Sequence, residues 1–158
     1  MIIDLTAEDF MVAATKGAVR QLVAIKNNRM GHDHGGKSYR KMTQRLADSI
    51  LGELGEIAVS KFTGLTQMST LQITKAADIG ASIEVRTTEH ENGHLVLYDS
   101  SNNDYIFVFV TISGLKAILR GWINPEHGKK PEYFVEGDPD CYFVPQSALN
   151  PIETLPIK

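Results

Sequence analysis

Asp78, Glu84 and Arg86 are close together in the sequence and have the side chains needed to bind a metal ion and a phosphate. Residues 82–87 alternate in character and include β-branched side chains, a pattern that predicts a strand. Residues two apart on a strand share a face, so Glu84 and Arg86 are expected to point the same way. Asp78 is expected in a turn before the strand, where Gly80 lets the backbone bend. Two carboxylates and a guanidinium at one sheet edge suit a divalent cation and a phosphate.

A helix is needed to bring a further carboxylate to this edge. Residues 43–62 predict an amphipathic helix, because apolar residues recur there at helical spacing: Leu46, Ile50, Leu54 and Ile57. Glu53 and Glu56 are three residues apart and lie at the border of the apolar face. If this helix packs on the sheet, one of them reaches Asp78 and Glu84. Such a site holds Mg²⁺, which polarises a phosphoryl oxygen and acidifies a bound water.

Taken together, these segments resemble the PD-(D/E)XK nuclease superfamily, and most of all its small phage-encoded members. The family includes restriction endonucleases, Holliday-junction resolvases and phage exonucleases. The resemblance is carried by residues 52–59, 78–80, 84–88 and 121–123, and more faintly by 144–149. It implies an α/β (α+β) fold with a restriction-endonuclease-like core, in which helices flank a central mixed β-sheet.

The resemblance also implies a role for each site residue. Glu56 corresponds to the helix glutamate that helps to hold metal or orient water, and Asp78 and Glu84 to the acidic metal ligands. The backbone carbonyl of Val85 is a further ligand, and the implied cofactor is Mg²⁺, with Mn²⁺ as a substitute. Arg86 stands where the family usually has lysine. Arginine stabilises phosphate charge but does not readily lose a proton, so a general-base role is in doubt.

The choice between the two helix glutamates stays open from sequence. The match to the family motif favours Glu56, whereas a helical wheel places Glu53 nearer the apolar arc. A third interpretation makes both of them solvated helix residues, favoured only by the helix dipole.

Basic residues are concentrated in one part of this chain, although its net charge is -3. Residues 16–45 hold eight of the 16 lysines and arginines but a single acid, Asp33. This asymmetry is typical of a surface that binds nucleic-acid phosphates, and it predicts DNA binding that weakens steeply with salt. The alternative is an ordinary solvated helix face. The expected DNA contacts are Lys37, Arg40, Lys41 and Arg45, joined by Thr88 on the same strand face as Glu84.

Length and composition indicate one domain in a reducing compartment. The chain has 158 residues, 42% of them hydrophobic, enough for a single core. We expect one domain over 1–158, with a basic helical N-terminal region (about 5–45) before the core (about 46–150). The lone Cys141 excludes an internal disulfide framework. No signal peptide or long apolar run is evident, so we expect a cytoplasmic protein, in the host cytoplasm if phage-encoded, with no membrane partner.

Other elements follow from periodicity and turn residues. The first helix should run from Thr6 to about Asn27 and bury Phe10, Val12 or Ala13, Val19, Leu22 and Val23. Strands are expected at 71–74, 94–98, 105–111 and 115–123, and a hairpin turn at 92–93. After them we expect a loop at 125–131, irregular chain with one short strand at 133–144, and a short closing helix at 146–150. His32, Asp33 and His34 fit a polar loop better than a zinc pattern.

The leading hypothesis is a metal-dependent DNA endonuclease that hydrolyses phosphodiester bonds. The main alternative is a catalytically inactive nucleic-acid-binding or accessory phage protein with the same fold, which the arginine at position 86 favours. A third is an interaction protein whose carboxylates are only surface charge. Many nucleases of this family act as homodimers, but no surface for a homodimer is identifiable from the sequence.

Overall fold

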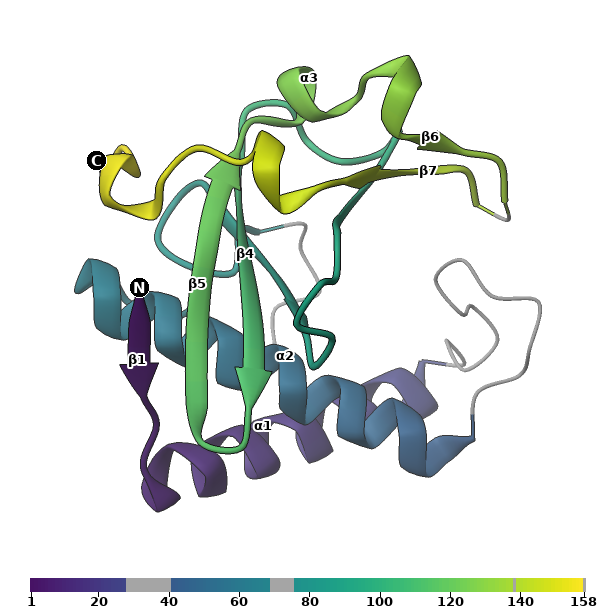
Figure 1. The fold of residues 1–158 in the computed structure, drawn as a ribbon. Helices are drawn as coiled ribbons and strands as arrows, with labels where there is room; N and C mark the ends of the chain where they lie inside the picture. The colour runs from purple at the N-terminus through teal and green to yellow at the C-terminus, as the bar shows by residue number, and fades with distance from the viewer. Residues whose placement is uncertain (28–40, 69–75, 138, 158) are drawn as a thin grey trace.

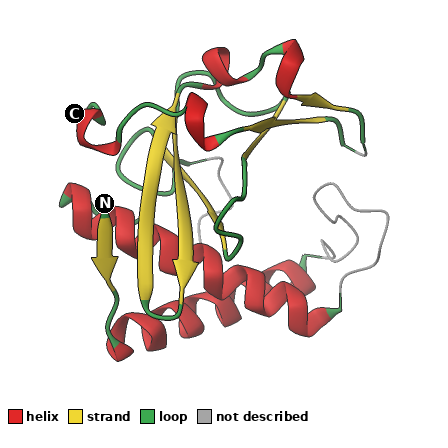
Figure 2. Ribbon diagram, in the orientation of Figure 1, coloured by secondary structure: helices red, strands yellow, loops and turns green. Residues whose placement is uncertain are grey.

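The computed structural model describes residues 1–27, 41–68, 76–137 and 139–157. Two long helices, a four-stranded sheet and a smaller three-stranded sheet make up these residues (Figure 1; Figure 2). Helix α2 packs on the four-stranded sheet, and helix α1 packs on α2. The predicted mixed α+β class, with helices beside a mixed sheet, is therefore confirmed.

Both long helices form where the sequence predicts them. Helix α1 (Ala7–Lys26) begins with a capping box, in which the Asp9 N–H donates to Thr6 Oγ1 (3.2 Å) and the Thr6 N–H donates to Asp9 Oδ2 (2.7 Å). Helix α2 (Met42–Thr63) ends at Gly64, whose positive φ of 72° suits glycine. The cap residues thus fix where each helix begins or ends.

The buried face of α1 agrees with the prediction at Ala13, one of two alternatives there, and differs from it elsewhere. Phe10, Val12 and Leu22 are exposed, whereas Ala13 and Gly17 are buried. The two helices approach closely at Gly17, where an added Cβ would lie 3.0 Å from the backbone nitrogen of Ile50. Small residues therefore make the contact with α2, and the large apolar side chains on other faces of α1 remain outside it.

The four-stranded sheet has the order β1-β5-β4-β2. Strand β2 pairs in parallel with β4, and the other pairs are antiparallel. Strand β4 is buried in the middle of the sheet, as predicted for residues 105–111, and β2 lies at an edge. The short β1 was not predicted. The strands are β1 (Ile2–Asp4), β2 (Ile83–Thr88), β4 (Ile106–Ser113) and β5 (Lys116–Ile123).

The hairpin predicted at residues 92–93 is wrong. The chain does turn there, with the Gly93 N–H donating to the His90 carbonyl at 2.9 Å, but the flanking strands do not pair. Strand β3 (Leu95–Tyr98) instead belongs to the second sheet, of order β3-β7-β6. The cause is burial, because Leu95 and Leu97 pack against the face of β4 that α2 does not cover.

The C-terminal third is more ordered than the sequence predicts. Residues 125–131, predicted as loop, include a short helix, and 133–144 form two strands rather than one. The predicted closing helix is a single 3₁₀ turn. The predicted strand at 71–74 and the His32–Asp33–His34 segment lie outside the described residues. The elements here are α3 (Pro125–Gly128), η1 (Pro131–Tyr133), β6 (Phe134–Val135), β7 (Cys141–Val144), η2 (Gln146–Ala148) and η3 (Ile152–Thr154).

Two apolar clusters lie on opposite faces of the four-stranded sheet. The larger one joins α2 to the sheet, and the smaller one joins the sheet to β3 and β7. Alternate residues of β4 supply both clusters, Val108 and Val110 to the first and Phe107 and Phe109 to the second. Among the described helices, none has the length and apolar character required to cross a bilayer.

Candidate metal and phosphate site

Strand β2 presents its charged residues as the sequence predicts. Ile83 and Val85 are buried in the cluster beneath α2, while Glu84 and Arg86 alternate with them and are half-buried. Because β2 is an edge strand, Glu84 and Arg86 lie at an open side of the sheet. Glu84 and Arg86 therefore lie at a boundary where a ligand can approach from solvent.

Asp78 is held beside this strand by a compact turn. The Met68 N–H donates to the Asp78 carbonyl (2.9 Å), and the Gly80 N–H donates to the Thr66 carbonyl (3.0 Å). Gly80 adopts a positive φ of 55°, as its position in a tight turn requires. The Asp78 carboxylate accepts a hydrogen bond from the Val85 N–H at 2.8 Å. The turn thus places one carboxylate against the backbone of β2.

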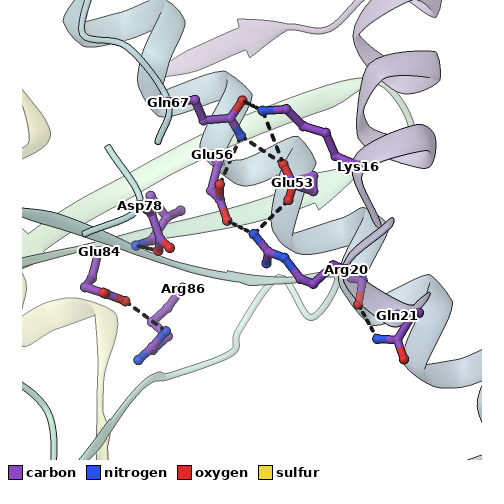
Figure 3. A network of polar contacts seen from close by, with 11 residues as sticks. Lys16, Arg20, Gln21, Glu53, Glu56, Gln67, Asp78, Glu84 and Arg86 are labelled. Carbon is purple, nitrogen blue, oxygen red and sulfur yellow. Dashed lines mark hydrogen bonds and ion pairs between the residues drawn. The ribbon is translucent and has the colours of Figure 1, made fainter. Parts of the chain in front are cut away.

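Glu84 and Glu56 lie on either side of Asp78 and respond to its charge. Burial raises the pKa of Glu84 to about 7, and the Asp78 carboxylate adds to that shift while Arg86 opposes it. Burial likewise raises the pKa of Glu56 to about 7, again with the Asp78 charge adding to it. Strand, turn and helix thus bring three carboxylates into one neighbourhood (Figure 3). Their mutual repulsion favours a bound cation or proton.

Arg86 is the cation on the solvent side of this group. Its Nη1 lies 3.5 Å from Glu84 Oε2, a long contact, and its guanidinium lies over the Phe107 ring, 5.1 Å from the centroid. Within the described residues, its buried Nε has no hydrogen-bond partner. The Phe107 ring thus holds a guanidinium that still has donors for an anion.

A second polar cluster, which sequence reasoning missed, lies on the inner side of Glu56. Arg20 Nη2 lies 2.7 Å from Glu53 Oε1 and 3.0 Å from Glu56 Oε1. Gln67 Nε2 donates to Glu53 Oε2 (3.1 Å) and to Glu56 Oε2 (3.0 Å), and Lys16 Nζ lies 3.7 Å from Glu53 and donates to Gln67. Figure 3 shows these side chains between α1 and α2. We call Lys16, Arg20, Glu53 and Gln67 the inner cluster.

The inner cluster compensates a fully buried charge. Glu53 has no exposed surface, and a carboxylate in that position requires nearby cations and donors. Burial alone would lower the pKa of Arg20, but the charges of Glu56 and Glu53 outweigh it and raise the pKa. The one signal for the inner cluster in the sequence was the set of basic residues on α1, which we interpreted as part of a DNA-binding surface. In the structure, Lys16 and Arg20 contact the helix glutamates.

Both helix glutamates are buried, so the interpretation of them as solvated residues is wrong. Glu53 is surrounded by the inner cluster, whereas Glu56 lies between that cluster and Asp78. Both oxygens of Glu56 already have partners, Arg20 on one and Gln67 on the other. Glu56 therefore connects the inner cluster to the carboxylates at the strand edge.

The predicted nucleic-acid contacts are only partly within the described residues. Lys37 and Arg40 lie outside them. Lys41 is exposed at the start of α2, and Arg45 follows one turn later, half-buried. At 1.5 Å per residue, Arg45 lies about 16 Å along the helix axis from Glu56. Thr88 is at the end of β2, where its Oγ1 accepts a hydrogen bond from the His90 N–H at 3.2 Å.

Oxygen donors with excess negative charge are the ligands that Mg²⁺ prefers, and Asp78 and Glu84 supply them at the strand edge. Within residues 1–27, 41–68, 76–137 and 139–157, no three acidic, histidine or cysteine side chains already converge on one point suited to a metal ion. Glu56, the third carboxylate nearby, has Arg20 on one oxygen and Gln67 on the other. The donor set fits a hard divalent cation held first by Asp78 and Glu84.

No family model, curated protein or solved structure matches this chain. A function for it is therefore inferred from its own side chains and their surroundings.

Proposed function

We propose that this protein is a metal-dependent DNA endonuclease that hydrolyses phosphodiester bonds. We also propose that its fold has a restriction-endonuclease-like core. The observation that carries the proposal is the pair of carboxylates Asp78 and Glu84 at the open edge of β2, with Arg86 beside them and the buried Glu56 behind Asp78. Burial and a neighbouring charge raise the pKa of both Glu56 and Glu84, and perturbed carboxylates of this kind are a marker of functional sites.

Mg²⁺, or Mn²⁺ in its place, would be held by Asp78, Glu84 and the backbone carbonyl of Val85. When bound, such an ion polarises a phosphoryl oxygen and acidifies a water molecule. The electrostatics support this assignment, because a divalent cation would relieve the repulsion that raises the pKa of Glu84. Glu56 would help to hold the ion or orient water, once Arg20 or Gln67 releases one of its oxygens.

Arg86 would bind the scissile phosphate and stabilise the charge that develops on it. Its guanidinium is positioned over Phe107 and retains donors, so it can form the paired hydrogen bonds that arginine makes to phosphate. Arginine does not readily give up a proton, so we assign Arg86 no general-base role. Lys41 and Arg45, with Lys37 and Arg40, would bind flanking DNA phosphates, and Thr88 would add a hydroxyl donor.

A second candidate is a catalytically inactive DNA-binding or accessory protein with the same fold. Two observations favour it: arginine rather than lysine stands at position 86, and both oxygens of Glu56 are occupied by protein donors. In that case Arg20 and Gln67 occupy the Glu56 oxygens in place of a metal ion, and Arg86 binds a DNA phosphate without taking part in catalysis.

The test is cleavage of supercoiled plasmid and branched DNA with Mg²⁺ or Mn²⁺, with EDTA as the metal-free control. Wild type is expected to nick DNA only with metal, and Glu84→Ala to lose at least about 100-fold in rate, as expected for loss of a charge-stabilising group in a catalytic site. Glu126→Ala, an exposed carboxylate on α3, is the matched control and should cut like wild type.

Cleavage that persists in EDTA, or a Glu84→Ala variant as active as wild type, would contradict the nuclease site. No cleavage of any substrate, with salt-sensitive DNA binding retained, would instead establish the inactive binding protein.

A further inference from the structure

A groove runs from the candidate site to the second sheet. Two adjoining cavities, of about 750 and 850 Å³, lie between the edge of β2 and the β3-β7-β6 sheet. Both are lined by Arg86, Val96, Tyr98 and Pro139, so Arg86 lies where they meet. Glu84 lines the first cavity. The candidate catalytic edge therefore borders a larger binding space made of two cavities, each with a volume typical of pockets for small organic ligands.

Aromatic rings line both parts of this groove. Tyr98, Tyr105 and Phe107 lie around the first cavity, beside Glu84. Phe143 lines the second and is 40% exposed, although it is a large apolar side chain. Phe107 is 1% exposed and lies beneath the Arg86 guanidinium, so the accessible rings are the half-buried Tyr98 and Tyr105 and the exposed Phe143. Accessible planar rings in an open groove are surfaces on which nucleobases stack, at single-stranded sites above all.

The wall beside the first cavity is fixed rather than loose. Lys129 Nζ donates to the carbonyls of Asp99 (3.0 Å) and Ser101 (2.9 Å) and to the Asn103 side chain (3.0 Å), and so closes the turn after β3. Ser101 Oγ accepts from the Tyr98 N–H at 3.0 Å. A wall held in this way loses little conformational freedom when a ligand binds.

The charge distribution indicates that a phosphate would lie where the two cavities meet, at Arg86. The Arg86 side chain is 34% exposed, and its contact with Glu84 is long, at 3.5 Å. A nucleotide with its phosphate on Arg86 would have its base among the aromatic side chains. A base paired in a duplex would first have to be unpaired and flipped out of the stack, so a base that is already unpaired enters at a lower cost.

We propose that this groove binds an unpaired nucleotide of the DNA substrate, so that the protein acts on single-stranded DNA or on unpaired ends and flaps rather than within intact duplex. The proposal deepens the nuclease assignment and rests on it for the identity of the site, but it can be tested by binding alone. Its decisive pair of residues is Phe143, which lines the groove, and Phe134, an exposed ring on β6 that lines neither cavity.

The experiment measures binding of a fluorescein-labelled single-stranded oligonucleotide and of its blunt duplex by anisotropy, in EDTA so that neither is cut. Wild type is expected to bind the single strand at least ten-fold more tightly than the duplex. Phe143→Ala should weaken single-strand binding about five-fold or more, the loss of one base–aromatic stack, whereas Phe134→Ala should not. Thermal melting of each variant shows that it is folded.

Equal affinity for both DNA forms, or equal effects of Phe143→Ala and Phe134→Ala in folded protein, would overturn the groove assignment. The two proposals fail separately. Binding of single strands through Phe143 without any metal-dependent cleavage overturns the nuclease and keeps the groove. Cleavage that depends on Glu84 but is unaffected by Phe143→Ala overturns the groove and keeps the nuclease.

Discussion

Glu53 and Glu84 are two carboxylates in opposite situations. Glu53 is fully buried and has Arg20, Lys16 and Gln67 around it, with the nearest cation 2.7 Å away. Glu84 has a side chain that is 19% exposed, a long 3.5 Å contact with Arg86, and the Asp78 carboxylate hydrogen-bonded beside it. Both are acidic residues near the same sheet, but only the first is electrically compensated by the protein.

This difference separates structural charge from charge that is available to a ligand. A buried carboxylate whose charge the protein already balances gains little from a further cation. Removing one of its partners would cost several kcal/mol of free energy. An uncompensated carboxylate at an accessible edge can gain from a cation that the protein does not supply. Glu56 has features of both, because its oxygens face Arg20 and Gln67 while Asp78 raises its pKa.

The largest expected effect is on stability, from removing the compensated charge. Glu53→Ala opens a cavity, removes the carboxylate partner of Lys16 and leaves Arg20 with Glu56 alone, and we expect the free energy of unfolding to fall by about 3–5 kcal/mol. Urea denaturation at neutral pH measures it, with the exposed Glu126→Ala as the control, expected within about 0.5 kcal/mol of wild type. If Glu53→Ala is as stable as wild type, the inner cluster is not structural and the comparison fails.

The next effect concerns the uncompensated side. Mg²⁺ is expected to raise the melting temperature of wild type. The free energy of unfolding should rise by about 2.7 kcal/mol when the ion is at 100 times its Kd. Asp78→Asn should abolish this shift, because the variant lacks the negative charge that binds the ion. The side-chain oxygen that remains can still accept the hydrogen bond from the Val85 N–H, so the turn should be kept. Differential scanning fluorimetry with NaCl at matched ionic strength measures it. An equal Mg²⁺ shift in Asp78→Asn would place the ion elsewhere.

The strand-edge half of the site could be predicted because its pattern is local. Alternation over 82–87 fixes which face Glu84 shares with Arg86, and Gly80 marks the turn that carries Asp78. The same holds for α1 and α2, whose caps and apolar spacing are properties of neighbouring residues. Features set by neighbouring residues, such as strand alternation, turns and helix caps, are therefore the ones that the sequence predicts correctly.

The inner cluster could not be predicted because its contacts join distant segments. Arg20 and Glu53 belong to different helices, and nothing in either helix indicates that they face each other. The exposed Phe10 and Leu22 show the same limit, since periodicity identifies apolar stripes but not which stripe finds a partner. Strand β3 was assigned to the wrong sheet because a tight turn does not determine pairing when burial favours another face.

The smallest effect is a pH dependence that distinguishes Glu84 from Glu53 directly. The pKa of Glu84 is about 7 in the folded protein against an ordinary value of 4.5, so between these values the folded state binds more protons than the unfolded state. This group therefore lowers stability as pH rises from about 4.5 to 7, and the loss persists above pH 7. Glu84→Gln removes the charge and should be more stable than wild type at pH 8 in EDTA, by roughly 1 kcal/mol.

At pH 5, where wild-type Glu84 is protonated, the two proteins should have nearly equal free energies of unfolding. Urea denaturation in EDTA at pH 5 and pH 8 measures both differences, and titrations that the two proteins share cancel in the comparison. A Glu84→Gln variant less stable than wild type at pH 8 would mean that Glu84 is held by favourable contacts as Glu53 is. The edge of β2 would then have no unbalanced charge to offer a metal ion, and Arg86 alone would remain as a ligand-binding group.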